Sequence, residues 1–365
     1  MLPRHPFLRS FGLVLLAVLA VHVAVAAVYL AHPESFYYRA WEYFFAWANK
    51  TERMDSRWQG VETSDLGRRY MFLYQEPRST VVTTDADGFR SVPDHLGPPR
   101  ILVQGRSNVF GSGVSDHETY PWQLAELSGV ATFNGAHGEL LSTLSRPGLE
   151  NIELVIDVVH ERHLADLPTM KRLYTLRQSS LQPYTPIAAN DENALTVMTR
   201  PLLRPVWWLP DIMLRQWRRL LTDLKEVRVH GRRSQLALPF NSDGSPPQAT
   251  TALLAQRCKR VEALGYRYLG LVIPARHVVY GLPDKDADVM QRGREIAAQV
   301  EAAGCPMVNL FNAFTLPAAA GYYFNYDTHW SPGGQTMAAK LTVEELALRW
   351  PTLLSEGSVQ TQTLP

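Results

Sequence analysis

Residues 100–107, which run RILVQGRS, form a short apolar segment that breaks into a glycine turn and ends on Ser107. An apolar run of this length is typical of a buried parallel strand, and the glycine marks the point where the chain turns away. Comparable runs predict further strands at residues 131–134, 152–159, 268–273 and 307–311. Helix-compatible segments separate these runs, at residues 119–127, 252–264, 286–303 and after Pro332. Such alternation indicates βαβ units and a parallel sheet covered on both faces, so we expect a flavodoxin-like three-layer α/β/α domain.

The N-terminal part of the chain predicts a membrane anchor. Residues 10–31 contain one His and no Asp, Glu, Lys or Arg, and roughly 20 residues suffice to cross a hydrocarbon core. Arg4 and Arg9 precede this stretch, so the positive-inside rule predicts that residues 1–9 are cytoplasmic and that the rest of the chain is extracytoplasmic. A cleaved signal peptide is the alternative, because residues 24–26 resemble a cleavage site. The anchor is favoured because the apolar segments of signal peptides are usually shorter, roughly 7–15 residues.

Beyond the anchor, the composition divides the chain into a linker and a domain. Residues 32–82 are expected to hold a linker and, at residues 36–47, an aromatic-rich helix that suits the membrane interface or could equally pack on the domain. The α/β domain is expected over residues 83–350. It begins with TTDADGFRS at residues 83–91, where Asp87-Gly88 supplies the positive φ of a turn.

Residues 165–250 interrupt the α/β rhythm with prolines and a stretch rich in Gly, Ser and Pro, so we expect an insertion there. Its middle, residues 207–229, combines tryptophans with Arg and Lys. This pattern is typical of a basic amphipathic helix on a membrane or an acidic polymer, or of an ordinary helix with a solvated basic face. Residues 351–365 are expected to form a C-terminal tail.

Charge and cysteine content exclude several classes of protein. The chain has 36 Lys and Arg against 35 Asp and Glu, so no overall field favours nucleic acid as a partner. Its two cysteines, Cys258 and Cys305, exclude a cysteine-based metal cluster and leave either one disulfide or two buried free thiols. His137, His160 and His163 lack the carboxylates or cysteines that would complete a tetrahedral metal site. We expect no metal and no organic cofactor.

Ser107 and a later Asp-x-His pair predict a catalytic triad. Ser107 follows the first strand of the domain, at the sheet edge where open α/β sheets bind ligands. Its hydroxyl needs a base to become a nucleophile, and the base needs a third group to hold its tautomer. Asp327 and His329, in the segment YDTHW, can supply both functions. The alternative is structural, with Ser107 capping a helix, His329 hydrogen-bonded in a loop and Asp327 forming a turn.

The sequence resembles the SGNH (GDSL-like) hydrolase superfamily, and within it the membrane-anchored alginate O-acetyltransferase-like branch. The matching segments are residues 84–90 (TDADGFR), 101–123 (ILVQGRSNVFGSGVSDHETYPWQ), 133–138 (FNGAHG), 155–164 (VIDVVHERHL), 271–280 (LVIPARHVVY) and 323–334 (YFNYDTHWSPGG).

This resemblance implies roles for individual residues. Ser107 corresponds to the nucleophile of the family, His329 to its base and Asp327 to the orienting acid. The backbone amides of Ser107 and Gly138, together with Asn134, are expected at the oxyanion or substrate. Two positions depart from the family pattern: Arg106 stands where an Asp is usual, and a segment containing Arg162 replaces the usual Asn. Both arginines are therefore candidates for contact with the oxyanion or the substrate.

The resemblance implies O-acyl transfer, and more narrowly O-acetyl transfer, to an extracytoplasmic polysaccharide or cell-envelope glycan through an acyl-serine. It also implies a multispanning membrane acyltransferase as a partner and a periplasmic domain on the inner membrane. A carbohydrate esterase is one alternative, because the same triad can serve water. A non-catalytic glycan-binding scaffold of a polymer-export complex is another, which Arg106 keeps open.

Overall fold

The structure is a computed structural model of the chain. It describes residues 6–31, 56–62, 76–160, 176, 180–184, 247–274, 276, 279, 283–315, 321–325 and 327–354. The expected aromatic helix at residues 36–47, the middle of the insertion at residues 207–229, Arg162 and most of the C-terminal tail lie outside these residues.

The core of the molecule is a five-stranded sheet. Its order across the sheet is β4 (Thr132–Asn134), β3 (Ile101–Gln104), β5 (Leu154–His160), β6 (Arg267–Ile273) and β7 (Met307–Asn309). Every neighbouring pair is parallel. Counted along the chain, this is the strand order of the flavodoxin-like fold, so the predicted fold class is confirmed.

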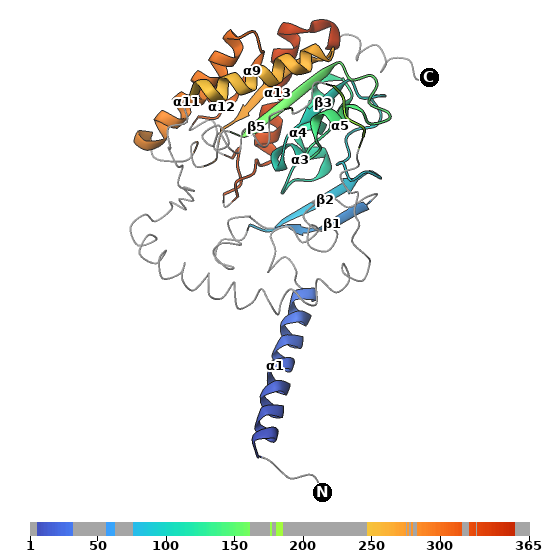
Figure 1. Cartoon of the computed structure of the whole chain (residues 1–365), viewed down its shortest axis with the longest axis vertical. Helices are drawn as coiled ribbons and strands as arrows, with labels where there is room; N and C mark the ends of the chain where they lie inside the picture. Colours follow the sequence, from blue (N-terminus) through green and yellow to red (C-terminus); the bar gives the residue numbers. More distant parts are fainter. Residues whose placement is uncertain are drawn as a thin grey trace.

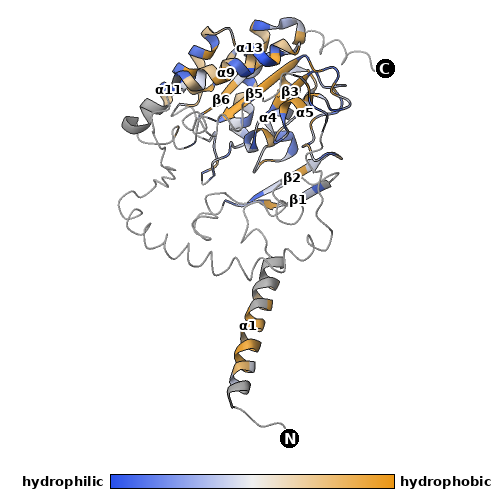
Figure 2. Ribbon diagram, in the orientation of Figure 1, coloured by the Kyte–Doolittle hydropathy of each residue, from blue (hydrophilic) through white to orange (hydrophobic). Residues whose placement is uncertain are grey.

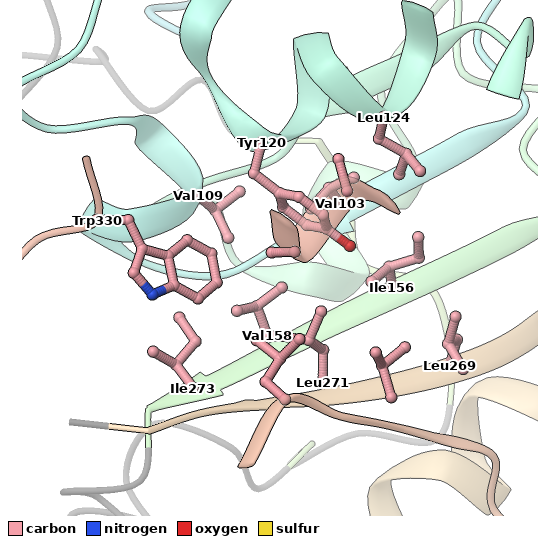
Figure 3. Packing of buried hydrophobic residues seen from close by; sticks show 14 of the residues in the cluster. Val103, Val109, Tyr120, Leu124, Ile156, Val158, Leu269, Leu271, Ile273 and Trp330 are labelled. Atoms are coloured by element: carbon pink, nitrogen blue, oxygen red, sulfur yellow. The ribbon is translucent and has the colours of Figure 1, made fainter. Parts of the chain in front are cut away.

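One face of the sheet is covered by α4 (Tyr120–Ser128) and α13 (Pro332–Arg349), with the short helix α3 (Ser107–Phe110) at its edge. Successive residues of a strand point to opposite faces, so every second residue of β3, β5 and β6 enters this layer. Figure 3 shows the strand side chains Val103, Ile156, Val158, Leu269, Leu271 and Ile273 gathered with Tyr120, Leu124 and Trp330. Trp330 thus belongs to the core although it directly follows His329.

The opposite face is covered by α5 (Leu140–Leu144), α9 (Pro247–Ala263) and α11 (Pro283–Ala302), which completes the three layers (Figure 1). Cys258 of α9 and Cys305, just before β7, form a disulfide whose Cα atoms are 6.1 Å apart. Of the two states that the sequence left open for these cysteines, the structure has the disulfide.

An antiparallel pair of strands precedes the parallel sheet, where a linker was expected. β1 (Ser56–Glu62) pairs with β2 (Arg78–Thr84) along its whole length, and Figure 1 shows the pair apart from the central sheet. Alternate residues of β2 are buried, so the strand packs one face on the domain. The segment RSTVVTT is rich in β-branched residues, which favour a pleated, half-buried surface. Assigning all of residues 32–82 to a helix and linker was therefore wrong for these two strands.

The N-terminal helix α1 spans Pro6–Ala31, and Figure 2 shows mainly hydrophobic colours along its described residues. Within the part of the chain that the structure describes, no helix meets both the length and the hydropathy of a membrane span. The anchor at residues 10–31 stays a prediction.

Two remaining elements are short. A 3₁₀ turn, η3 (Asp116–Glu118), precedes α4, and α12 (Leu310–Ala313) follows β7 directly. The strand predicted at residues 307–311 therefore ends two residues early. The side chain of Asn309 causes this, because it accepts a hydrogen bond from the amide of Phe311 at 3.1 Å and so caps the helix.

Candidate active site

Ser107 stands at the carboxyl end of β3, as the first residue of α3. The chain runs from β3 to β4 on one side and then to β5 on the other, so Ser107 lies at the point where the strand order reverses. Open α/β sheets bind their ligands at this point. Gly105 makes the sharp turn possible, because a Cβ there would lie 2.4 Å from the Val109 side chain. Gly111 ends the helix in the left-handed region at φ 84°.

Ser107, His329 and Asp327 form a continuous hydrogen-bonded relay. Nε2 of His329 lies 2.9 Å from Oγ of Ser107, and Nδ1 lies 2.6 Å from Oδ1 of Asp327. The same carboxylate oxygen accepts the backbone amide of His329 at 3.1 Å, which fixes the imidazole relative to its own loop. Asp327 and His329 are 1% and 6% exposed, whereas Ser107 is half-buried and can meet a substrate. The geometry meets the requirements for an activated serine nucleophile.

The second oxygen of Asp327, Oδ2, accepts a hydrogen bond from Nη2 of Arg78 at 2.8 Å. Burial alone would raise the pKa of Asp327, but the interactions with His329 and Arg78 outweigh burial and hold the pKa below its usual value. Asp327 is therefore ionised at neutral pH and can support a positively charged imidazole.

Asn108 joins the serine turn to the loop that carries the base. Its side-chain oxygen accepts the amide of Trp330 at 3.0 Å, and its carbonyl accepts Nε2 of Gln335 at 3.1 Å. Gln335 in turn accepts the amide of Tyr120 at 2.8 Å, which ties α13 to α4. Because Asn108 follows Ser107 and Trp330 follows His329, these bonds fix the nucleophile and the base relative to each other. The local sequence around Asn108 gives no sign of this role.

Residues 84–90, the segment TDADGFR, are structural. Oδ1 of Asp85 accepts the amides of Asp87 and Phe89, both at 2.9 Å, and Gly88 takes φ 87° as predicted. Arg146 binds the two aspartates at 2.8 Å each. Buried Arg90 completes the segment by binding the carboxylate of Asp116 and the carbonyls of residues 81, 110, 111 and 114. It thereby fixes the loop that follows the serine helix.

One family model matches the C-terminal part of the chain. Residues 234–365 match the model of a family described as the SGNH hydrolase-like domain of acetyltransferase AlgX. Over these residues the chain is similar to an SGNH hydrolase-like domain of the AlgX type. Asp327 and His329 lie inside the matched residues, whereas Ser107 precedes them and is joined to them by the relay. The match indicates hydrolase or acyltransferase chemistry.

Two solved structures are similar to the chain. One is a protein assigned to the SGNH hydrolases, from Slackia heliotrinireducens, with 16% identity, a TM-score of 0.34, and coverage of 68% of this chain and 100% of that one. The other is assigned to the G-D-S-L lipolytic family, from Desulfitobacterium hafniense, with 9% identity, a TM-score of 0.36, and coverage of 68% and 99%. Superpositions this loose carry no argument about activity. No curated protein sequence matches the chain.

Asn134 and Gly138, which were expected at the oxyanion, lie at the end of β4 and in the turn after it, and both make other hydrogen bonds. The backbone amide of Gly138 donates to the carbonyl of Gly135 at 3.2 Å. Asn134 is fully buried; its side chain donates to the carbonyl of Val109 at 3.0 Å and accepts the amide of Ala136 at 3.2 Å. In this state, Asn134 and the Gly138 amide stabilise the turn after β4. Their roles toward an oxyanion stay predictions.

Arg106, directly before Ser107, is exposed and has an extended backbone. Its role toward the oxyanion or substrate stays a prediction, and Arg162 lies outside the described residues. Among the described residues, no group of three or more His, Cys, Asp or Glu side chains could hold a metal ion.

A groove of about 510 Å³ lies at the opposite, amino-terminal edge of the sheet, between the segments that lead into β3, β4 and β5. Arg100 and Glu153 line it and bind each other there at 2.6 Å. The groove and Ser107 lie at opposite ends of β3, so the groove is not part of the candidate active site.

Proposed function

We propose that the SGNH-like domain transfers O-acyl groups, and specifically O-acetyl groups, to a polysaccharide or cell-envelope glycan through an acyl-serine on Ser107. The relay carries this proposal: a half-buried serine hydroxyl, an imidazole at 2.9 Å and a buried carboxylate at 2.6 Å from that imidazole. The AlgX-type family match supports acetyl transfer over other uses of a serine nucleophile.

Acylation follows from the geometry. Oγ of Ser107 attacks the carbonyl carbon of the acyl donor while Nε2 of His329 takes the hydroxyl proton. Asp327 stabilises the imidazolium that forms, and Arg78 keeps that carboxylate in place. When the tetrahedral intermediate collapses, the bond to the donor oxygen breaks and His329 returns the proton to that oxygen. The acyl group is then an ester of Ser107.

Deacylation repeats the steps with an acceptor hydroxyl. His329 removes the proton of a sugar hydroxyl, whose oxygen attacks the acyl-serine carbonyl. The Ser107–acyl bond breaks, the serine oxygen recovers the proton from His329, and the acylated glycan leaves. Water in place of the sugar would make the same site an esterase. The ratio of acyl transfer to the sugar over acyl transfer to water therefore decides whether the enzyme is a transferase or an esterase.

The setting belongs to the same proposal. An anchor at residues 10–31, with the domain on the periplasmic side of the inner membrane, would keep the site beside an exported polymer. A multispanning membrane acyltransferase would supply acyl groups there. The absence of charged residues from residues 10–31 and the basic residues before them support this arrangement.

The test uses the full chain and 4-nitrophenyl acetate, with intact-mass detection of an acetyl adduct. Ser107→Ala and His329→Ala are compared with the wild type, and Ser128→Ala at the end of α4 serves as the matched serine control. We expect an adduct and ester turnover in the wild type and the control, and neither in the other two variants.

A second arm adds oligosaccharides, one neutral and one built from uronic acids, and measures acetylated sugar against free acetate. Acetylated sugar identifies a transferase, whereas acetate alone in the presence of either sugar identifies an esterase. Equal reactivity of all four proteins, or no adduct on any of them when folded, would refute the catalytic role of Ser107. Sugar binding that survives Ser107→Ala without turnover would then favour the scaffold.

A further inference from the structure

We propose that Arg78 is a positioning residue of this reaction, so that the working unit is a four-member chain: Ser107, His329, Asp327 and Arg78. The inference rests on the proposed function and deepens it. Arg78 belongs to β2, outside the parallel sheet, and lies 249 residues before the aspartate that it binds.

Arg78 is held on both sides. Its Nη2 donates to Oδ2 of Asp327 at 2.8 Å, and its Cζ lies 3.5 Å from the centroid of the Phe324 ring. The side chain is 12% exposed. Gly113, at φ 86°, leaves room for the guanidinium, because a Cβ at this position would come within 2.7 Å of Nη2. A planar cation that stacks on an aromatic ring and binds a carboxylate at its edge requires arginine.

The two oxygens of Asp327 are divided between two partners. Oδ1 faces Nδ1 of His329, and Oδ2 faces Arg78. A carboxylate bound at one oxygen can rotate about its Cβ–Cγ bond and let the imidazole turn with it. A charge-assisted bond at the other oxygen removes that rotation. Arg78 thus acts through Asp327 on the direction in which Nε2 of His329 points.

The segment just before Asp327 is also bound by Glu76, a neighbour of Arg78 in the sequence. Glu76, two residues before Arg78, accepts the backbone amide of Asn325 at 3.0 Å and its side-chain amide at 3.2 Å. From the other side, Nε of Arg276 donates to the carbonyl of Phe324 at 3.1 Å. The segment at residues 324–325 is therefore held between two elements, which presents the Phe324 ring to Arg78.

β2 also holds the loop that follows the serine helix. The amide of Val81 donates to Oγ of Ser115 at 3.2 Å, and the amide of Thr83 donates to Oδ1 of Asp116 at 3.0 Å. One strand therefore contacts both loops of the relay, near its middle through residues 81–83 and at its start through Arg78. This placement explains why a residue outside the SGNH-like sheet can set the geometry of the relay.

The test measures the reactivity of Ser107 without relying on the natural substrates. The full chain is treated with a fluorophosphonate, which forms an Oγ–P bond, releases fluoride and passes the serine proton through His329 to solvent. The rate of adduct formation is followed by intact mass. The variants are Arg78→Gln, which removes the charge, and Arg78→Lys, which keeps the charge but cannot reproduce the planar stack.

Arg146→Gln is the matched control. Arg146 also binds carboxylates at 2.8 Å, stacks on Phe89 and Phe133 at 5.3 and 5.0 Å, and is 17% exposed. It does so at the TDADGFR turn, away from the relay. Thermal unfolding of each variant measures the structural cost, and labelling rates are compared for folded protein only.

We expect Arg78→Gln to slow labelling about 10- to 100-fold, by analogy with the loss of an outer group that orients a metal-binding side chain, with Arg78→Lys between it and the wild type. Arg146→Gln should lower the melting temperature without slowing labelling. If the wild type is labelled and folded Arg78→Gln is labelled at the same rate, the positioning role of Arg78 is overturned and the proposed function stands. Absence of wild-type labelling would overturn the proposed function, and the role of Arg78 with it.

Discussion

Replacing Arg90 with Met should sharply destabilise the protein. Arg90 is 2% exposed and makes five hydrogen bonds, one to a carboxylate and four to backbone carbonyls. Breaking a buried charge pair by removing one partner costs roughly 3–5 kcal/mol, because the other charge is left uncompensated. For a domain of this size, each kcal/mol lowers the melting temperature by about 2–4 °C. We therefore expect a decrease of about 6–20 °C.

Thermal unfolding of the full chain, followed by near-UV circular dichroism, measures this decrease. Arg267→Met is the control, because Arg267 faces Glu153 at 3.5 Å with both side chains 39% exposed, and such pairs contribute about 0–1 kcal/mol. If Arg90→Met does not fold, Arg90→Lys should give an intermediate loss, since an ammonium group can reach only some of the acceptors. A melting temperature of Arg90→Met or Arg90→Lys equal to that of the control would refute the reasoning.

Four further outcomes are expected. Asp327→Asn should lower the acylation rate by up to about 10⁴-fold, as the loss of the orienting carboxylate allows the wrong imidazole tautomer; a labelling assay with folded protein checks this. The stability of the wild type should also fall progressively as the pH decreases below about 4, because the pKa of Asp327 is lower in the folded than in the unfolded chain and its protonation therefore favours unfolding; the Asn variant should lose less in acid denaturation. Burial raises the pKa of Tyr120, more than its bond to Thr342 lowers it. Stability should therefore fall as the pH rises above about 10, and Tyr120→Phe should flatten that decline in denaturant titrations at high pH. Reducing the Cys258–Cys305 disulfide, which spans 47 residues, should cost about 4 kcal/mol by loop-closure entropy; urea midpoints with and without reductant test this, and identical midpoints would contradict it.

The parallel sheet and the relay could be predicted from the sequence because their signals are local or compositional. Strands buried on both faces give continuous apolar runs, and β3, β5 and β6 fall within one or two residues of the predicted segments. Ser107 follows such a run, and Asp327 and His329 are two residues apart, so each piece is visible within a short window.

The missed features depend on contacts between distant residues. β1 and β2 lack a long apolar run, and the β-branched residues of RSTVVTT were the available signal for β2. Arg78 could not be connected to Asp327 because nothing in either segment specifies a partner 249 residues away. The same holds for Asn108, whose contacts with Trp330 and Gln335 depend on how α13 docks. For Asn134 and Gly138, the sequence indicates the loop in which they lie. It does not indicate that the Asn134 side chain and the Gly138 amide make hydrogen bonds within that loop.

The bond between Ser107 and His329 joins positions 222 residues apart, which determines when reactivity appears during synthesis. Ribosomes make the N-terminal part of a chain first, so β3, β4 and β5 are complete long before the loop that carries the base. Until α13 docks against α4 and brings that loop to Asn108, the serine is an ordinary alcohol. A nascent or prematurely terminated chain therefore cannot consume acyl donors.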